Sequence, residues 1–432
     1  MRRFPDWNCV VPYAFCLKGE LDVLLLRRSL DEITRRHGAL RTTIPIVHGT
    51  PKLEICNSHT HRLDIVTVAG HPRAEVEKRA RQLFAQFAAT KMATETGPLF
   101  EVSLLKLSDR EHWLLLAIHR LVADCFSAEQ LLQEIWALYG QSASSRPASL
   151  VTDPPQYSDY ALWQETQAGQ WLQRHEDYWS RRLGGATSVR WPVDSAAVQA
   201  GQPLSAMMSR HFGKELSERV SDFARHARSL AAMIILTVYV AVMWRWNGQR
   251  DFVVPFNVAG RQSEHKLVVG YFAHILYLRI QLTGEETFDE LQRLVSGEFF
   301  RALAHQDFGR QAAQRPELLA GTFCQWVTWH PGTASDQSNS ASAPRLDVQR
   351  LPLSEFGQGL SMLPPSMVDV DLTFFDTDQG IYAQGVYRAD RFLPTTIERL
   401  MRTLLSATEL FVRNPRSSLT ALPSISVQSN DL

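Results

Sequence analysis

The run Trp113-Leu114-Leu115-Leu116-Ala117-Ile118 continues as His119-Arg120-Leu121-Val122-Ala123-Asp124-Cys125-Phe126-Ser127, and this stretch is the strongest indicator of the architecture. The apolar run predicts a buried strand, because side chains on both of its faces are hydrophobic. Ser127 and Gln130 predict a capping box that starts a helix, with Ser127 as the N-cap. His119, Arg120 and Asp124 are therefore expected in a loop held between a strand's carboxyl end and a capped helix.

Further strands and helices are expected on both sides of this loop. Residues 9–18 alternate loosely as a strand, and Leu26, Leu30 and Ile33 recur at helical spacing after it. The other segments that carry a strand or helix pattern in the first half are 52–67, 73–91, 99–107 and 155–182. Strands alternating with helices favour the α/β class.

The second half shows the same alternation of strands and helices, after a break in periodicity between Gly184 and Pro203. Its expected elements are a strand near 207–213, helices at 215–227 and 230–246, and a strand at 251–256. We therefore predict one lobe at 1–185, a second at 186–415, and a tail at 416–432. The Ser-rich stretch 333–344 and the tail are expected to be a mobile loop and a disordered end.

The composition narrows the class of protein. A chain of 432 residues, 45% hydrophobic, is long enough for two lobes, and its net charge of 0 gives no reason to expect nucleic acid or an anionic membrane as a partner. The most apolar window, 231–244, is shorter than the roughly 20 residues of a spanning helix and predicts a core helix. Five scattered cysteines without metal-type spacing and no recognisable leader predict a reducing, cytoplasmic location and no metal site.

Several motifs, taken together, resemble one family. The chain is similar to the condensation domains of nonribosomal peptide synthetases, whose His-His-x-x-x-Asp-Gly segment places His119 in the first His position and Asp124 in the Asp position. The other similar segments are Arg36–Thr42, Tyr157–Trp163, Pro255–Arg261, Val269–Arg279 and His305–Asp307. The matches follow the family's order over roughly residues 10–410.

The resemblance implies a fold like that of chloramphenicol acetyltransferase: two α/β lobes in a V arrangement with a central substrate tunnel. It implies acyl transfer, in which a carrier-bound acyl or peptidyl thioester is joined to an amine or alcohol. The substrates would arrive on the phosphopantetheine arms of carrier proteins, with no bound cofactor, and the protein would be a monomer.

Three positions depart from the family pattern. Arg120 replaces the second His, which is the family's base, Cys125 replaces the Gly after the Asp, and His274 stands where Asn is usual. The family's opening segment is also absent before Asp6. Ordinary condensation activity therefore depends on what these replacements do.

Arg120 cannot act as a general base, because its guanidinium stays protonated and has no acceptor. It could instead hold a carboxylate, a phosphate or a tetrahedral oxyanion. The resemblance gives His119 and Asp124 mainly structural roles and pairs Asp124 with Arg261. A histidine at 274 could replace the base or be a hydrogen-bonded strand residue. Cys125 could be a nucleophile or an inert buried thiol.

Three functions remain open from the sequence. The first is an amide- or ester-forming condensation enzyme of nonribosomal peptide or hybrid polyketide biosynthesis. The second is a catalytically inactive condensation-like domain that recruits a tailoring oxygenase or docks carrier proteins. The segment Ala117–Asp124 resembles the His-Arg-x-x-x-Asp form that such recruitment domains carry, although Cys125 departs from their usual following acid. The third is an acyltransferase that uses coenzyme A.

Overall fold

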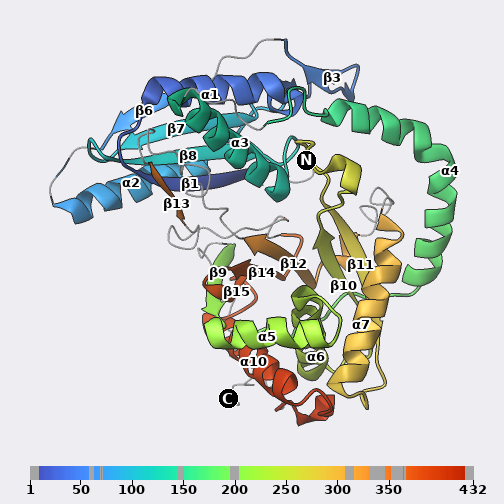
Figure 1. The fold of residues 1–432 in the computed structure, drawn as a ribbon. Helices are drawn as coiled ribbons and strands as arrows, with labels where there is room; N and C mark the ends of the chain where they lie inside the picture. Colours follow the sequence, from blue (N-terminus) through green and yellow to red (C-terminus); the bar gives the residue numbers. More distant parts are fainter. Residues whose placement is uncertain are drawn as a thin grey trace. The chain divides into compact units, whose positions relative to one another are not determined.

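The chain forms two compact units in a computed structural model, shown as a ribbon in Figure 1. Unit 1 consists of residues 1–168, 261–273 and 331–358, and unit 2 of residues 169–260, 274–330 and 359–432. The structure describes residues 9–57, 63–68, 70, 72–144, 150–194, 204–306, 316–329, 346–351, 363 and 366–423.

Unit 1 is built on a five-stranded sheet in the order β13-β1-β8-β7-β6. Its strands are β1 (Val10–Lys18), β6 (Asp64–Thr67), β7 (Phe100–Lys106), β8 (Glu111–His119) and β13 (Asp347–Leu351). β8 pairs antiparallel with both β1 and β7, and Val10 lies opposite His119 in the register. The carboxyl end of β8 therefore lies beside the start of β1.

Helices cover both faces of this sheet (Figure 1). They are α1 (Val23–Arg36), α2 (Arg73–Ala88) and α3 (Cys125–Ser144). α2 packs Ala80 and Phe84 against Ala14, Cys16 and other apolar residues of one sheet face, and α1 contacts α3. The alternation of strand side chains makes both layers possible, because each strand of the sheet presents apolar residues to both faces.

The remaining elements of unit 1 are short, apart from the first part of α4 (Tyr157–Leu183). They are η1 (Gly38–Arg41), β2 (Thr42–Thr43), β3 (Ile46–Val47), β4 (Thr50–Pro51), β5 (Glu54–Ile55) and η2 (Ser263–His265). β2 pairs with β5 and β3 with β4, both antiparallel. The strand expected over 52–67 is thus two short strands, β5 and β6.

Unit 2 contains a six-stranded mixed sheet in the order β11-β10-β12-β14-β15-β9. Its strands are β9 (Ser205–His211), β10 (Asp251–Val258), β11 (His274–Gln281), β12 (Thr322–Trp329), β14 (Val370–Thr377) and β15 (Gly380–Arg388). Its other elements are α5 (Lys214–His226), α6 (Ala231–Asn247), α7 (Phe288–Leu303), η4 (Pro316–Leu318), α10 (Pro394–Arg413), η6 (Leu419–Ala421) and the end of α4.

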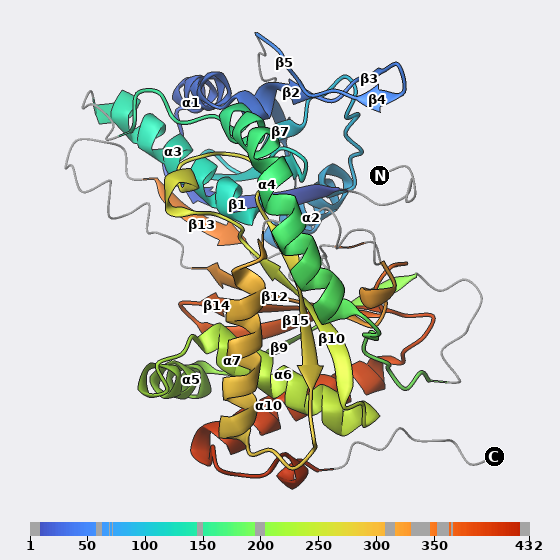
Figure 2. The same cartoon turned by 90° about the vertical axis from the view of Figure 1, so that its right-hand side faces the viewer.

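The apolar window at 231–244 is a core helix, as predicted. It forms most of α6, which contacts α5, α7 and α10 (Figure 2), and Tyr239 and Val240 are completely buried. In the described part of the chain, no single helix is long and apolar enough to span a membrane. α5 and α6 would pass that test only as a pair, and they are bent by 105° relative to each other.

The compact units differ from the predicted division at residue 185. The chain first passes from unit 1 to unit 2 between Ala168 and Gly169, inside α4, and two later segments, 261–273 and 331–358, return to unit 1. Part of the predicted linker is packed structure, because Val189 and Trp191 are buried and the Trp191 indole donates to the Gly321 carbonyl at 2.6 Å. The predicted loop at 333–344 lies outside the described residues.

The expectation of a disordered tail after Pro415 is wrong for residues 416–423. Leu419 and Leu422 are buried, and Ser418 forms an isolated bridge with Thr287. The Phe288 amide also donates to the Ser417 carbonyl at 3.0 Å. Buried leucines and backbone hydrogen bonds hold this segment on unit 2, although its composition is polar.

Candidate functional site

The candidate loop lies between β8 and α3 in unit 1, as the sequence predicts. The helix nevertheless starts three residues earlier than a cap at Ser127 would allow. α3 begins at Cys125, and Asp124 Oδ1 accepts a hydrogen bond from the Ser127 amide at 2.8 Å. Asp124 is therefore the capping residue, and the prediction of Ser127 as the N-cap is wrong.

Asp124 also forms the ion pair that the resemblance implies. Arg261 Nη2 lies 2.9 Å from Asp124 Oδ1, and both side chains are 4% exposed. The second carboxylate oxygen, Oδ2, accepts from the Phe272 amide at 3.0 Å. One carboxylate thus caps α3 and fixes the segment 261–273.

Arg261 is held both by this segment and by the start of α3. Its Nη1 donates to the carbonyls of His265 at 3.0 Å and Val268 at 2.7 Å. Its guanidinium carbon lies 4.7 Å from the ring centre of Phe126 and 4.3 Å from that of Phe272. These contacts compensate the desolvation of a buried charge.

Ser127 has a role that the sequence did not predict. It is fully buried, and its Oγ donates to the Gly270 carbonyl at 2.7 Å and accepts from the Gly270 amide at 3.0 Å. Arg261 Nη2 also donates to Ser127 Oγ at 2.5 Å. Ser127 of α3 therefore binds the segment around Gly270 to the start of the helix.

Gly270 is required by a close approach of Tyr157. A Cβ placed on Gly270 would lie 2.0 Å from Tyr157 Cδ2. The Tyr157 hydroxyl donates to the Tyr271 carbonyl at 2.8 Å, and burial raises its pKa to about 12. The two residues belong to different motifs of the sequence, and the fold packs them together.

His119 is buried and is a poor proton acceptor. It is 2% exposed, and its Nδ1 accepts from the Leu121 amide at 3.2 Å. Burial, reinforced by the Arg120 charge, lowers the pKa of His119 to about 4. The imidazole is therefore neutral at pH 7 and is engaged in shaping the loop.

Arg120 is 9% exposed and follows His119 directly. Its backbone amide donates to the Cys9 carbonyl at 2.9 Å, which ties the loop to the start of β1. In the described part of the chain, the charge of Arg120 contributes to the pKa shifts of four side chains besides His119: Cys9, Tyr13, Cys125 and Tyr271. Of these four residues, sequence reasoning had considered Cys125 and missed the other three.

The thiols and phenols near Arg120 are uncharged at neutral pH. Burial raises the pKa of Cys9 and of Cys125, although the Arg120 charge opposes the shift in both. Burial likewise raises the pKa of Tyr271 and raises that of Tyr13 well above its usual value. Cys125 therefore lacks the thiolate character that a nucleophile needs.

A second buried network lies behind the loop and includes residues of the Arg36–Thr42 motif. Glu134 accepts from Arg36 Nε at 3.2 Å and lies 3.0 Å from His37 Nε2. Burial alone would raise the pKa of Glu134, but hydrogen bonds from His37, Gln130 and Arg36 lower it. Gln130, the predicted capping-box partner, instead bonds Glu134 at 3.0 Å and the Leu267 carbonyl at 2.8 Å.

His274 belongs to unit 2, whereas Arg120 belongs to unit 1. It is the first residue of β11, is partly exposed, and lies opposite Val258 in the register with β10. Its action as a replacement base stays a prediction. Among the described residues, no three or more His, Cys, Asp or Glu side chains are grouped as metal ligands.

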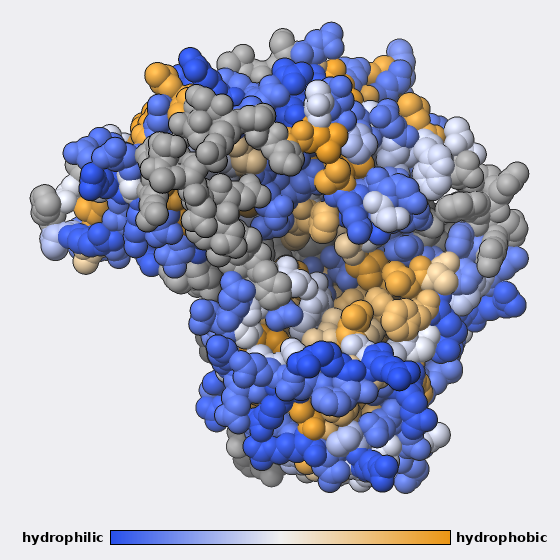
Figure 3. Space-filling model, in the orientation of Figure 1, coloured by the Kyte–Doolittle hydropathy of each residue, from blue (hydrophilic) through white to orange (hydrophobic). Residues whose placement is uncertain are grey.

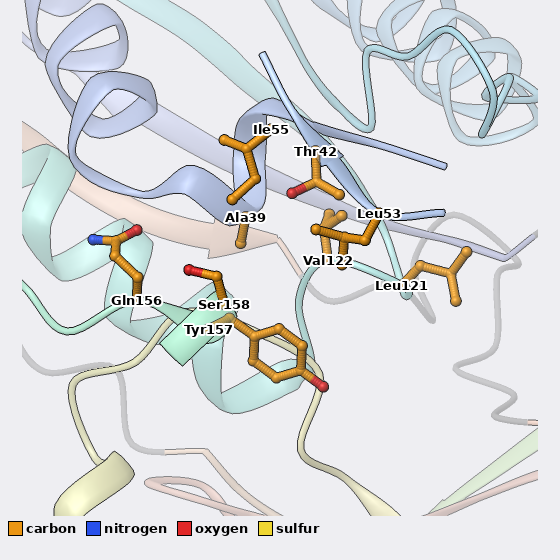
Figure 4. Close-up of a pocket in the computed structure, with 9 residues that line it drawn as sticks. All are labelled: Ala39, Thr42, Leu53, Ile55, Leu121, Val122, Gln156, Tyr157 and Ser158. Carbon is orange, nitrogen blue, oxygen red and sulfur yellow. The ribbon is translucent and has the colours of Figure 1, made fainter. Parts of the chain in front are cut away.

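A small pocket adjoins the loop in unit 1 (Figure 4). Leu121 and Val122 line it from the loop, and Ala39 and Ile55 line it from the segment that follows α1. The first turn of α4 contributes Tyr157. The cavity volume is about 10 Å³, which is the space of a single water molecule.

The family model described as "Condensation domain" matches residues 6–431. The chain belongs to the condensation-domain family. One polypeptide of the linear gramicidin synthase of Brevibacillus parabrevis is 31% identical over 425 residues, which are 97% of this chain but 5% of that protein. The chain therefore corresponds to a small part of the length of this relative.

Solved structures show the same fold. SgcC5 from Streptomyces globisporus matches with a TM-score of 0.76 at 24% identity, over 95% of this chain and 94% of that one. The X-domain in a complex with OxyB from teicoplanin biosynthesis matches with a TM-score of 0.76 at 20% identity, over 98% of this chain and 92% of that one. The condensation-domain protein thus has the predicted α/β fold like that of chloramphenicol acetyltransferase.

Proposed function

We propose that this condensation-domain protein joins a carrier-bound acyl or peptidyl thioester to an amine or alcohol in nonribosomal peptide or hybrid polyketide biosynthesis. One observation carries the proposal: the buried Asp124–Arg261 pair, to which Ser127 is hydrogen-bonded, holds the loop that contains Arg120. A fixed loop of this kind provides the positioning on which acyl transfer depends.

The acceptor nitrogen or oxygen attacks the thioester carbonyl, a new C–N or C–O bond forms, and the C–S bond breaks to release the carrier thiol. Negative charge develops on the carbonyl oxygen before the C–S bond breaks. Arg120, a buried cation with five donors, is suited to stabilise that oxyanion. The proton that the acceptor loses passes to water and then to the departing sulfur.

The rate should be low compared with that of a domain that has histidine at position 120. His119 has a pKa of about 4 and is therefore a weak base, and Arg120 cannot accept a proton. A positioned general base contributes about 10²–10⁴ in rate. We therefore expect slow transfer by the natural protein.

The alternative function is recruitment without catalysis. The described side chains whose pKa the Arg120 charge affects are a weakly basic histidine, two thiols and two phenols, and none of them is a strong base at neutral pH. The partner would then be an oxygenase, as in the X-domain complex with OxyB, or a carrier protein. A transferase that uses coenzyme A is the third candidate.

The proposal includes the partners and the location. Condensation domains work with carrier proteins, so we propose acyl or peptidyl carriers as the source of both substrates, with no resident cofactor. We also propose a monomer in the cytoplasm, where the five cysteines would stay reduced.

The test is a single-turnover mass-spectrometric assay with an acyl-loaded carrier protein and a soluble amine. The natural protein is compared with Arg120→His, and Arg35→His is the matched control because Arg35 is an exposed arginine of the same unit. We expect slow transfer by the natural protein and by the control, and transfer about 10²–10⁴ times faster by Arg120→His.

The other outcomes select the alternatives. Silence from the natural protein with transfer by Arg120→His would identify a lost base and favour recruitment. Silence from both, with a free-amine acceptor and the acyl-carrier donor both verified, would contradict the transferase proposal. Transfer from acyl-coenzyme A but not from the carrier would select the third candidate.

A further inference from the structure

The pocket beside the loop has no role in the chemistry described above, although it lies next to Arg120 in the chain. Leu121 and Val122 form part of its wall, and consecutive Cα atoms lie about 3.8 Å apart. The Leu121 and Val122 amides donate to Nδ1 and the carbonyl of His119, at 3.2 and 3.0 Å. The pocket wall is thus fixed to the candidate site by hydrogen bonds.

We propose that this pocket is a subsite for a small uncharged side chain of the substrate, of the size of alanine's methyl group. The inference rests on the proposed function, because it assigns the substrate class of that same site. Its support comes from the polarity of the lining, the exposure of apolar residues at the pocket, and its size.

Three of the four polar side chains of the lining are engaged within the protein, and the fourth is that of Ser158. The Thr42 hydroxyl donates to the Gly38 carbonyl at 3.1 Å, and the Tyr157 hydroxyl donates to the Tyr271 carbonyl at 2.8 Å. The Gln156 side chain accepts from the Gly38 amide at 2.9 Å and donates to two backbone carbonyls. A charged side chain placed here would lose its water and gain at most the Ser158 hydroxyl, so the pocket favours an uncharged group.

Three large apolar side chains at the pocket are exposed: Leu53 by 51%, Leu121 by 39% and Ile55 by 38%. Hydrophobic residues reach the face of unit 1 seen in Figure 3 in small groups among hydrophilic ones. Grouped exposed apolar side chains beside a candidate site mark a ligand-binding surface. A substrate that covers them would remove this surface from water.

The size of the pocket sets the class of side chain. Its volume of about 10 Å³ leaves room for no group larger than a methyl, and the buried residues Ala39 and Val122 limit its depth. Figure 4 shows Ala39, Ile55 and Val122 around the same space. One methylene too many in an apolar pocket costs about tenfold or more in discrimination, so alanyl-type groups are preferred to leucyl-type groups.

The experiment measures binding without turnover. Isothermal titration calorimetry compares three aminoacyl-pantetheine amides, in which nitrogen replaces the thioester sulfur: alanyl, leucyl and aspartyl. The natural protein should bind the alanyl amide at least about tenfold more tightly than either of the others. Equal affinities, or no binding of any of the three, would overturn the subsite.

Two variants change the pocket in opposite directions. Ala39→Val fills it and should weaken alanyl binding about tenfold, whereas Ile55→Ala widens it and should reduce the preference for alanyl over leucyl. Leu24→Ala, on α1 with Leu24 66% exposed and outside the lining, is the control and should change neither. Ile55 is partly exposed, so Ile55→Ala decides the question if Ala39→Val does not fold.

The outcome is separable from that of the transfer assay. If the pocket variants shift the calorimetric preference while the natural protein and Arg120→His both transfer nothing, the subsite holds and the transferase proposal fails. If transfer occurs but neither pocket variant alters the preference, the transferase proposal holds and the subsite fails.

Discussion

At the Asp124 end of the loop, a carboxylate and a guanidinium are both 4% exposed and directly paired, whereas at the Arg120 end a guanidinium acts on thiols, phenols and a neutral imidazole. Both ends carry a buried cation. At the first end the charge is compensated by an acid of the same loop. At the second end, Arg120 stands at the position that the resemblance to the family's motif gives to the base.

The two residues also differ in whether their known bonds come from the side chain or from the backbone. Asp124 makes bonds to Ser127, Arg261 and Phe272, so its replacement would undo three contacts at once. Arg120 is anchored through its backbone amide to Cys9, a bond that any side chain except proline permits. The contacts of the loop therefore depend on the side chain of Asp124, whereas the bond from position 120 to Cys9 depends only on the backbone.

Asp124→Ala should destabilise the protein more than any other change considered. It leaves the Arg261 charge buried without its acid, and removing one partner of a buried pair costs about 3–5 kcal/mol in the free energy of unfolding. Chemical denaturation measures the loss. Glu32→Ala, which breaks the exposed pair with Arg35, should cost below about 1 kcal/mol, and equal losses in the two variants would remove the distinction between the two ends.

The next effect in size is a pH dependence from His119. Its pKa of about 4 lies below the 6.5 of an exposed histidine, so the unfolded state binds more protons between these values. The stability that this histidine contributes is therefore complete above about pH 6.5 and falls as the pH is lowered to 4, by about 3 kcal/mol.

Denaturation curves of the natural protein and of His119→Gln between pH 7 and 4 isolate this contribution, because glutamine does not titrate. The stability of the variant should change less across this range. An equal change in both proteins would show that the imidazole is not buried in its neutral form.

A third variant tests the contact between Gly270 and Tyr157. Gly270→Ala places a methyl group 2.0 Å from a ring atom of Tyr157, and overpacking of this kind costs about 1–3 kcal/mol. Thermal unfolding measures it. Gly140→Ala is the matched control, because a Cβ at Gly140 meets nothing within 4 Å, and a shift in unfolding temperature as small as that of the control would show that the segment moves aside.

Tyr157→Phe should have the weakest effect. It removes the hydroxyl that donates to the Tyr271 carbonyl but keeps the ring against Gly270 and Phe272. Loss of one such hydrogen bond costs about 0.5–1.5 kcal/mol, measured by chemical denaturation. An effect as large as that of Asp124→Ala would place the strongest link to the segment 261–273 at Tyr157.

Much of the local structure could be predicted from the sequence. The helical spacing of Leu26, Leu30 and Ile33 and the apolar run at 113–118 correspond to α1 and β8. The Asp124–Arg261 pair came from the family resemblance, and the structure contains it. The cap at Ser127 was misplaced, because Asp124 and Ser127 are both good caps and the spacing alone does not decide between them.

Local sequence patterns specify the helices and strands with strong periodicity, and the motifs specify the family. Periodicity and motifs can both be read from the sequence because they depend on residues that lie near each other in the chain. Three features could be recognised only in the folded structure. They are the hydrogen-bond partners of Ser127, the need for glycine at position 270, and the inclusion of segments 261–273 and 331–358 in unit 1. They depend on contacts between residues more than a hundred positions apart, as between Ser127 and Gly270. Such contacts form only when the strands and helices pack, and no local pattern records them.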